Sequence, residues 1–148
     1  METAKILNKL LAVITFLYAF IIYILTMAPT TSFWDCGEFI ATSITLGVPH
    51  PPGTPFYLLL GNLFSQLPTY SDLGARVNLI SPLFSALAVM FLYLIIVQLI
   101  EEWRGEVQNW PDRLITYSSA IIGAFTFAVT GSHWFNAVEA EVYSISTF

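Results

Sequence analysis

The longest charge-free stretch of this chain, residues 39–71, reads FIATSITLGVPHPPGTPFYLLLGNLFSQLPTYS and decides how often the chain crosses a membrane. It exceeds the roughly 20 apolar residues that span a hydrocarbon core about 30 Å thick. It also contains five prolines, and each one removes a backbone donor and clashes with the preceding helical turn. We therefore predict no spanning helix here. Two short helices, at 36–47 and 55–66, fit the remaining pieces and suit the membrane interface.

The composition identifies an integral membrane protein. Hydrophobic residues make up 56% of the 148 residues and charged residues only 10%, whereas soluble domains carry about 25% charged residues. The net charge of −5 comes from scattered residues with no basic cluster, so no nucleic-acid partner is expected. The lone cysteine, Cys36, has no partner for an intrachain disulfide and lacks zinc-ligand spacing. We expect it to be a small buried apolar side chain.

Three other charge-free runs are also long enough to cross a bilayer. We predict an all-α membrane protein with three transmembrane helices, near 8–28, 77–100 and 114–135. The first follows Lys5 and Lys9, as in a signal peptide. Its apolar run is longer than a signal peptide's hydrophobic core, so we expect an uncleaved anchor.

The placement of lysine and arginine predicts the orientation of these spans. Two lysines precede the first span, and two arginines lie in the loop 101–113. Positively charged loops stay in the cytoplasm, so the N-terminus and this loop are expected there. The loop 29–76 then lies outside, and the third span returns the chain to that side. One non-cytoplasmic surface would thus collect most ionisable groups: Asp35, Glu38, His50, His133, Glu139 and Glu141.

Each of these groups also has a purely structural interpretation. Asp35 and Glu38 have the spacing of a capping box, in which both side chains satisfy backbone N–H groups at a helix start. His50 begins HPPG, which is typical of a rigid turn. Glu139 and Glu141 are two apart, so they share a face only in an extended segment. A wet boundary after a membrane helix would also account for both glutamates.

Three motifs carry a resemblance to a known family. The blocks are FWDCGEFIATSITLGVPHPPGTPFYLLLGNLF at 33–64, RVNLISPLFSAL at 76–87 and HWFNAVEAEVYS at 133–144. In this order, and after a first membrane helix, they resemble the N-terminal part of the transmembrane O-mannosyltransferase-like proteins of bacteria and animals. That family is related to the protein O-mannosyltransferases. The resemblance extends over nearly the whole chain.

The resemblance implies a GT-C fold, with many membrane helices and interfacial helices in the first external loop. Such enzymes move a sugar, with inversion, from a polyprenyl-phosphate carrier to a Ser/Thr hydroxyl of an acceptor protein at the outer face. Family members are several times longer, so the chain is expected to be an N-terminal portion. A bacterial inner (plasma) membrane is the expected location. The expected partners are the lipid bilayer, the lipid-linked sugar donor and the acceptor protein.

The resemblance also implies which residues form the site. Asp35 matches the acidic catalytic residue of such enzymes, and Glu38 is its companion in D-C-G-E. His50, Glu139 and Glu141 match motif positions expected to bind substrate.

The chemistry of sugar transfer supports the same selection independently. A lipid phosphate is already a good leaving group, so a carboxylate such as Asp35 is needed mainly as general base. Partial desolvation beside Phe33 and Trp34 would strengthen that base. The donor phosphate requires cations or N–H donors, and Arg76 and His50 are the candidates, with the N-termini of the short helices.

Three alternatives remain open at this point. Carboxylates and imidazole could hold a divalent ion, but their spacings match no metal-ligand motif, so we predict no metal site and no other cofactor. A transporter would be expected to place ionisable residues near the middle of its spans, whereas the predicted spans carry no charged residue beyond Lys9 at the edge of the first. A non-catalytic scaffold subunit would have no need for clustered carboxylates.

Overall fold

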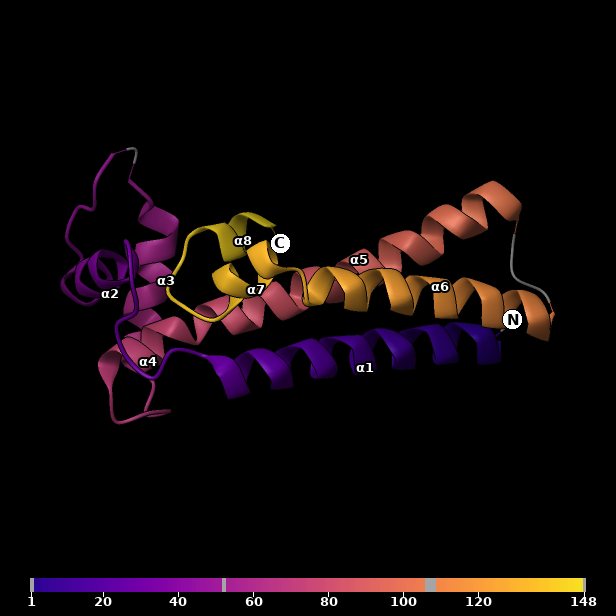
Figure 1. Cartoon of the computed structure of the whole chain (residues 1–148), viewed down its shortest axis with the longest axis horizontal. Coiled ribbons are helices and arrows are strands. Elements are labelled where there is room, and N and C mark those ends of the chain that lie inside the picture. Colours follow the sequence, from indigo (N-terminus) through magenta and orange to yellow (C-terminus); the bar gives the residue numbers. More distant parts are fainter. Residues whose placement is uncertain (1, 52, 106–108, 148) are drawn as a thin grey trace.

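The computed structural model describes residues 2–51, 53–105 and 109–147, and these residues form helices and no strand. Three long helices, α1, α5 and α6, lie along one another (Figure 1). The short helices α2, α3 and α4 gather at the end of this bundle away from the N-terminus, and α7 and α8 fold back against α5. The bounds are α1 Glu2–Thr26, α2 Cys36–Thr45, α3 Pro55–Ser65, α4 Leu73–Asn78, α5 Ile80–Arg104, α6 Trp110–Ala128, α7 Gly131–Ala137 and α8 Tyr143–Thr147.

The long helices confirm an all-α membrane protein. Two apolar helices, Thr3–Thr26 and Leu73–Arg104, are each long enough to cross a membrane. The first begins before the predicted span 8–28 and ends two residues short of it, and the second extends beyond 77–100 at both ends. Charged residues at a helix end do not stop these helices. The second takes in Arg76 and runs on past Glu101. It ends where Gly105 adopts a positive φ of 90°, a conformation that favours glycine.

The third predicted span is wrong as a single helix over 114–135. α6 and α7 are long and apolar enough to span a membrane only as a pair, and they are bent by 68° between them. The break lies where Thr130 takes an extended conformation, with φ −65° and ψ 137°. Its hydroxyl donates to the carbonyl oxygen of Phe127 at 2.7 Å. The chain turns without a proline because polar groups replace the lost helical bonds.

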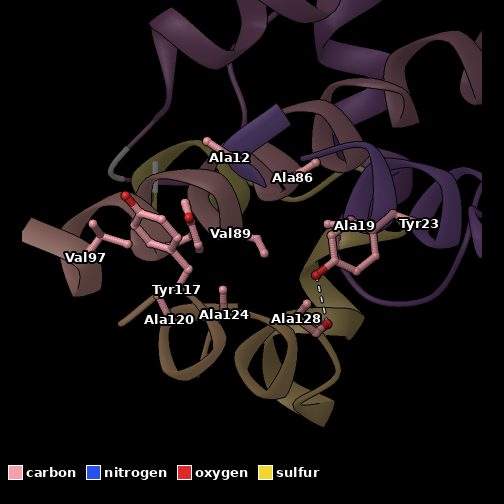
Figure 2. Close-up of a cluster of buried hydrophobic side chains, with 12 residues drawn as sticks. Ala12, Ala19, Tyr23, Ala86, Val89, Val97, Tyr117, Ala120, Ala124 and Ala128 are labelled. Atoms are coloured by element: carbon pink, nitrogen blue, oxygen red, sulfur yellow. Dashed lines mark hydrogen bonds between the residues drawn. The ribbon is translucent and has the colours of Figure 1, made fainter. Parts of the chain in front are cut away.

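One of these replacement bonds comes from α1. Tyr23 Oη donates to the carbonyl oxygen of Ala128, the last residue of α6, at 2.8 Å (Figure 2). Both residues are fully buried. The helix break is therefore tied to the neighbouring span.

Small residues line the contact between the three long helices. Helices in lipid approach closely where side chains are small, since dispersion contacts between them drive association. Figure 2 shows these side chains turned toward one another from α1, α5 and α6. We call them the alanine seam: Ala12, Ala19, Ala86, Ala120, Ala124 and Ala128, each buried.

The two short helices of the loop 29–76 are confirmed. α2 corresponds to the predicted 36–47 and α3 to 55–66. Pro55 opens α3, at a position where its missing N–H has no helical partner to lose. The helices touch at Gly61, where an added Cβ would lie 2.6 Å from the Cβ of Ser43.

A buried asparagine, Asn78, fixes the loop to the bundle. Its Nδ2 donates to the carbonyl oxygens of Ala28 and Thr30, each at 2.9 Å. Its Oδ1 lies 3.7 Å from Cys36 Sγ, at the start of α2. Cys36 is buried and free, as predicted. Ala28 N also donates to the carbonyl oxygen of Val138 at 2.8 Å, so the segments that follow α1 and α7 meet beside this loop.

Candidate functional site

A cavity of about 200 Å³ lies where the start of α2, the turn before α3 and the segment after α7 come together. Its walls come from parts of the chain that are distant in sequence. The lining residues are Asp35, Phe39, His50, Gly53, Thr54, Glu141, Val142 and Tyr143. Three of the predicted site residues, Asp35, His50 and Glu141, therefore line one cavity.

Glu38 holds His50 by two hydrogen bonds. The backbone N–H of His50 donates to Glu38 Oε1 at 2.7 Å, and Nδ1 of its ring lies 2.7 Å from Oε2. A carboxylate only accepts, so Nδ1 is the donor. These bonds raise the pKa of His50 and lower the pKa of Glu38. The turn predicted for HPPG is closed by Gly53 N, which donates to the carbonyl oxygen of His50 at 3.1 Å.

The capping-box interpretation of Asp35 and Glu38 is wrong. Asp35 is the residue before α2, but its side chain makes no capping hydrogen bond. Glu38 binds His50 and does not accept a backbone N–H group at the start of α2. The backbone enters α2 through Trp34 with a positive φ of 58°, and this tight entry replaces the predicted cap. The Asp35 carboxylate is left 58% exposed, with Oδ2 4.0 Å from Nε2 of His50.

Phe33 and Trp34 were expected to shield the Asp35 carboxylate from water, and they do not. The neighbouring aromatic side chains point away from the fold, since Phe33 is 79% and Trp34 84% exposed. The expected desolvation by these two rings is therefore wrong. Large exposed aromatics at this end of the bundle fit the headgroup layer of a membrane.

Glu139 and Glu141 are both buried, at 2% and 7% exposure, although only Glu141 lines the cavity. Desolvation raises the pKa of Glu141, and the nearby carboxylates of Glu139 and Asp35 raise it further. Glu139 Oε1 is buried without a hydrogen-bond partner. The expected wet boundary is wrong for this segment, because it packs against α5 through Ser81, whose Oγ accepts from Glu141 N at 3.4 Å.

Two other candidates lie away from the cavity. The guanidinium of Arg76 donates to the carbonyl oxygens of Tyr70 at 2.6 Å and Ser65 at 3.1 Å. It thereby joins the end of α3 to α4. His133 is buried in α7, where its ring meets the ring of Tyr23 edge-on and lies tilted against the ring of Phe127. Neither side chain is among those that line the cavity.

Some residues of this region were not selected from the sequence. Asn78 is a polar residue between Val77 and Leu79 at the start of an apolar run, which was the available signal. Nothing in the sequence marks Thr54 and Tyr143 as site residues. They reach the cavity because the folded chain places the turn before α3 and the segment after α7 side by side. The same fold brings ligand atoms of Asp35, Glu38 and His50 within 4.8 Å of one another, a geometry suited to a metal ion.

Comparisons with known proteins agree with the resemblance. The model of the family described as the protein O-mannosyl-transferase TMEM260 N-terminal domain matches residues 35–148. A protein O-mannosyl-transferase tmem260 of Dictyostelium discoideum is 28% identical over 137 residues, covering 90% of this chain and 15% of that protein. The Mus musculus protein O-mannosyl-transferase TMEM260 is 30% identical over 125 residues, covering 84% of this chain and 16% of that protein. No solved structure matches the chain significantly.

The chain thus spans about a sixth of the length of these relatives. Both are eukaryotic, so the comparisons give no support to the expected bacterial inner membrane. The family model covers well over half of the chain and includes the whole cavity. This chain belongs to the family of the protein O-mannosyl-transferase TMEM260 N-terminal domain.

Proposed function

We propose that the cavity is part of the active site of a membrane glycosyltransferase that transfers a mannose-like sugar from a polyprenyl-phosphate carrier to a Ser/Thr hydroxyl. The names of the relatives, protein O-mannosyl-transferases, support the reaction class. The observation that carries the proposal is the Asp35 carboxylate. It lines the cavity and makes no capping bond, so it is available as general base for the acceptor hydroxyl.

The other groups take supporting roles in this proposal. His50, held by Glu38, turns Nε2 toward Asp35 and is placed to contact the donor phosphate. Glu141 forms the opposite part of the lining and is placed near the sugar. Arg76 is not assigned to the phosphate, because its guanidinium is engaged by backbone carbonyls. The substitution of Asp35 tests the proposal most directly.

Asp35→Asn in the full-length protein keeps the side-chain size and removes the base. We expect transfer to an acceptor peptide, measured by mass spectrometry with polyprenyl-phosphate mannose, to fall at least about 100-fold, the lower end for general-base catalysis. The melting temperature should stay close to wild type, because Asp35 makes no capping bond.

Asp72→Asn is the matched control. Asp72 caps α4, where its Oδ1 accepts from Ala75 N at 3.0 Å, and asparagine caps about equally well. Transfer should be unchanged in this variant. Retained activity in Asp35→Asn would refute the assignment and direct the search for the base to Glu38 or Glu139. A full-length protein that transfers no sugar to any acceptor would favour the scaffold alternative.

The proposed orientation has the N-terminus and loop 101–113 in the cytoplasm and the cavity on the other side. The distribution of lysine and arginine supports it. Cysteines introduced at the exposed positions Thr69 and Glu102 test it with an impermeant thiol reagent on intact cells. The first should react and the second should not. The native Cys36 is buried and gives no background.

A further inference from the structure

We propose that a groove between α1 and α6 binds an anionic phospholipid, with an acyl chain along its apolar walls and the headgroup phosphate on Arg113. The groove lies where the first turns of α1 meet the start of α6, at the end of the bundle away from α2 and α3 (Figure 1). Lipid binding goes beyond the proposed function and does not rest on it. The proposed orientation assigns this end, and therefore the lipid, to the cytoplasmic leaflet.

The walls of the groove are mostly apolar, and its volume is about 220 Å³. Its aliphatic lining residues are Leu7 and Leu11 of α1 and Leu114 and Ile121 of α6. Tyr117 also lines the groove, and its side chain is only 5% exposed. Its Oη donates to the carbonyl oxygen of Ala4 at 3.3 Å. The two helices are thus joined beside the groove, which gives an acyl chain a fixed apolar surface.

The charged end of the groove is the first turn of α6. Among the described residues that line the groove, Arg113 is the one charged side chain, and no carboxylate is present. The adjacent carboxylate of Asp112 lies 3.6 Å from Arg104 of α5 and does not line the groove. A guanidinium matches the geometry of phosphate oxygens and binds them by paired hydrogen bonds. The groove therefore suits a ligand whose charge is negative.

Two tryptophans indicate the depth of this turn in the membrane. Trp110 begins α6, lines the groove and is 65% exposed, and Trp103, near the end of α5, is 88% exposed. Exposed indoles favour the headgroup layer. Arg113 lies within one turn of Trp110, and Ile121 lies about 12 Å further along the helix toward the membrane interior. A charge at headgroup level above an apolar channel has the same order of parts as a phospholipid.

A further helix of the full-length protein is the competing occupant. Helices in lipid associate mainly through small residues, and α6 turns its small residues, such as Ala120 and Ala124, toward the alanine seam. Its groove side carries the bulkier Leu114 and Ile121. A basic pocket between membrane helices on the cytoplasmic side is a typical site for lipid headgroups. Side-chain size and charge therefore favour a lipid.

Photocrosslinking of the full-length protein in detergent micelles tests the site. The probe is phosphatidylglycerol with a diazirine in its acyl chain, and mass spectrometry of the digested protein maps the crosslinks. We expect crosslinks within residues 7–11 and 114–121. Unlabelled phosphatidylglycerol should compete at a concentration about fivefold below that of phosphatidylcholine, the effect expected of one basic residue on an anionic lipid.

Two variants test the two ends of the groove. Arg113→Gln should remove the preference for phosphatidylglycerol. Ser118→Phe should fill the groove and suppress the crosslinks, because Ser118 lines it. The Ser118 hydroxyl donates only within its own helix, to the carbonyl oxygens of Leu114 and Ile115, so this substitution removes no contact between helices. The melting temperature shows whether each variant is folded, and Arg113→Gln decides the test if Ser118→Phe is not.

Lys9→Gln is the matched control. Lys9 is exposed at the same end of the bundle and does not line the groove, so the preference should persist in this variant. An equal loss of preference in Lys9→Gln and Arg113→Gln would refute the site, because it would assign the effect to the general charge of this surface.

Two further results would overturn the proposal. Crosslinks absent from both segments would show that a further helix or detergent occupies the groove. Equal competition by the two lipids in the wild-type protein would remove Arg113 from the site. Crosslinking requires no turnover, so a protein that binds the lipid as expected and transfers no sugar would refute only the proposed function.

Discussion

The alanine seam and the cavity region are stabilised in opposite ways. In the seam, α1, α5 and α6 approach closely at buried alanines, whose side chains are small and carry no polar atoms. Around the cavity, a buried apolar cluster that includes Phe39 packs beside the buried carboxylates of Glu139 and Glu141. Hydrogen bonds of Asn78 and Glu38 connect loops that have little regular structure. The seam therefore depends on the volume of its side chains, and the cavity region depends on which donor meets which acceptor.

Asn78→Ala should have the largest effect on stability. Two buried carbonyls, of Ala28 and Thr30, would each lose a donor at 2.9 Å. Unsatisfied buried groups cost about 1–3 kcal/mol each, so we expect about 3 kcal/mol in the free energy of unfolding of the full-length protein. Chemical denaturation in detergent measures it. Asn136→Ala, which removes a local bond to Ser132, is the control and should cost less than about 0.5 kcal/mol.

Ala124→Leu tests the volume rule of the seam. Ala124 is fully buried between helices, and overpacking of a close contact typically costs about 1–3 kcal/mol. We expect about 2 kcal/mol of destabilisation in the free energy of unfolding of the full-length protein. Ile122→Leu, at an exposed position of the same helix, should be nearly neutral. Equal effects of the two variants would show that the seam is not closely packed.

Gly61→Ala applies the volume rule to the cavity region, where α2 and α3 touch. The new Cβ would lie 2.6 Å from the Cβ of Ser43, so one helix must shift, at about 1.5 kcal/mol within the range for overpacking. Ser43→Gly should recover part of this loss in the double variant. If the two substitutions simply add, the helices do not meet at this point.

Tyr23→Phe applies the hydrogen-bond rule to a residue that packs beside the seam. It removes the bond from Tyr23 Oη to the carbonyl oxygen of Ala128, and we expect about 1 kcal/mol. Thermal unfolding of the full-length protein measures the change. Tyr18→Phe, in the same helix, serves as the control. A loss as large as that of Asn78→Ala would mean that both regions depend equally on hydrogen bonds.

The sequence predicted the features that depend on local chemistry. Prolines in 39–71 predicted where α2 and α3 form, and apolar length predicted α1 and α5. The break between α6 and α7 was missed because Thr130 and Gly131 interrupt a helix far less strongly than proline. Polar partners elsewhere in the fold, such as Tyr23, make that break possible.

The sequence predicted which residues belong to the candidate site better than it predicted how they contact one another. Asp35, His50 and Glu141 were selected from motifs and line one cavity. The choice between capping and binding at Glu38 depends on the position of His50, twelve residues away. Likewise, Arg76 was selected for its charge, but nearby carbonyls of Ser65 and Tyr70 engage it. Such choices depend on the path of the chain, which spacing alone does not encode.

The wall formed by Glu141 sets an order of assembly during synthesis. His50 emerges from the ribosome about 90 residues before Glu141, which corresponds to roughly 5–18 s at typical elongation rates. During that interval Asp35, Glu38 and His50 can pair, but the cavity stays open on the side that the returning segment later covers. The backbone N–H of Ala28 likewise cannot form its hydrogen bond until Val138, whose carbonyl oxygen accepts it, has been synthesised. The cavity is therefore completed only after α6 and α7 have been inserted, and a nascent chain halted at α5 would expose an unfinished acidic site to the membrane surface.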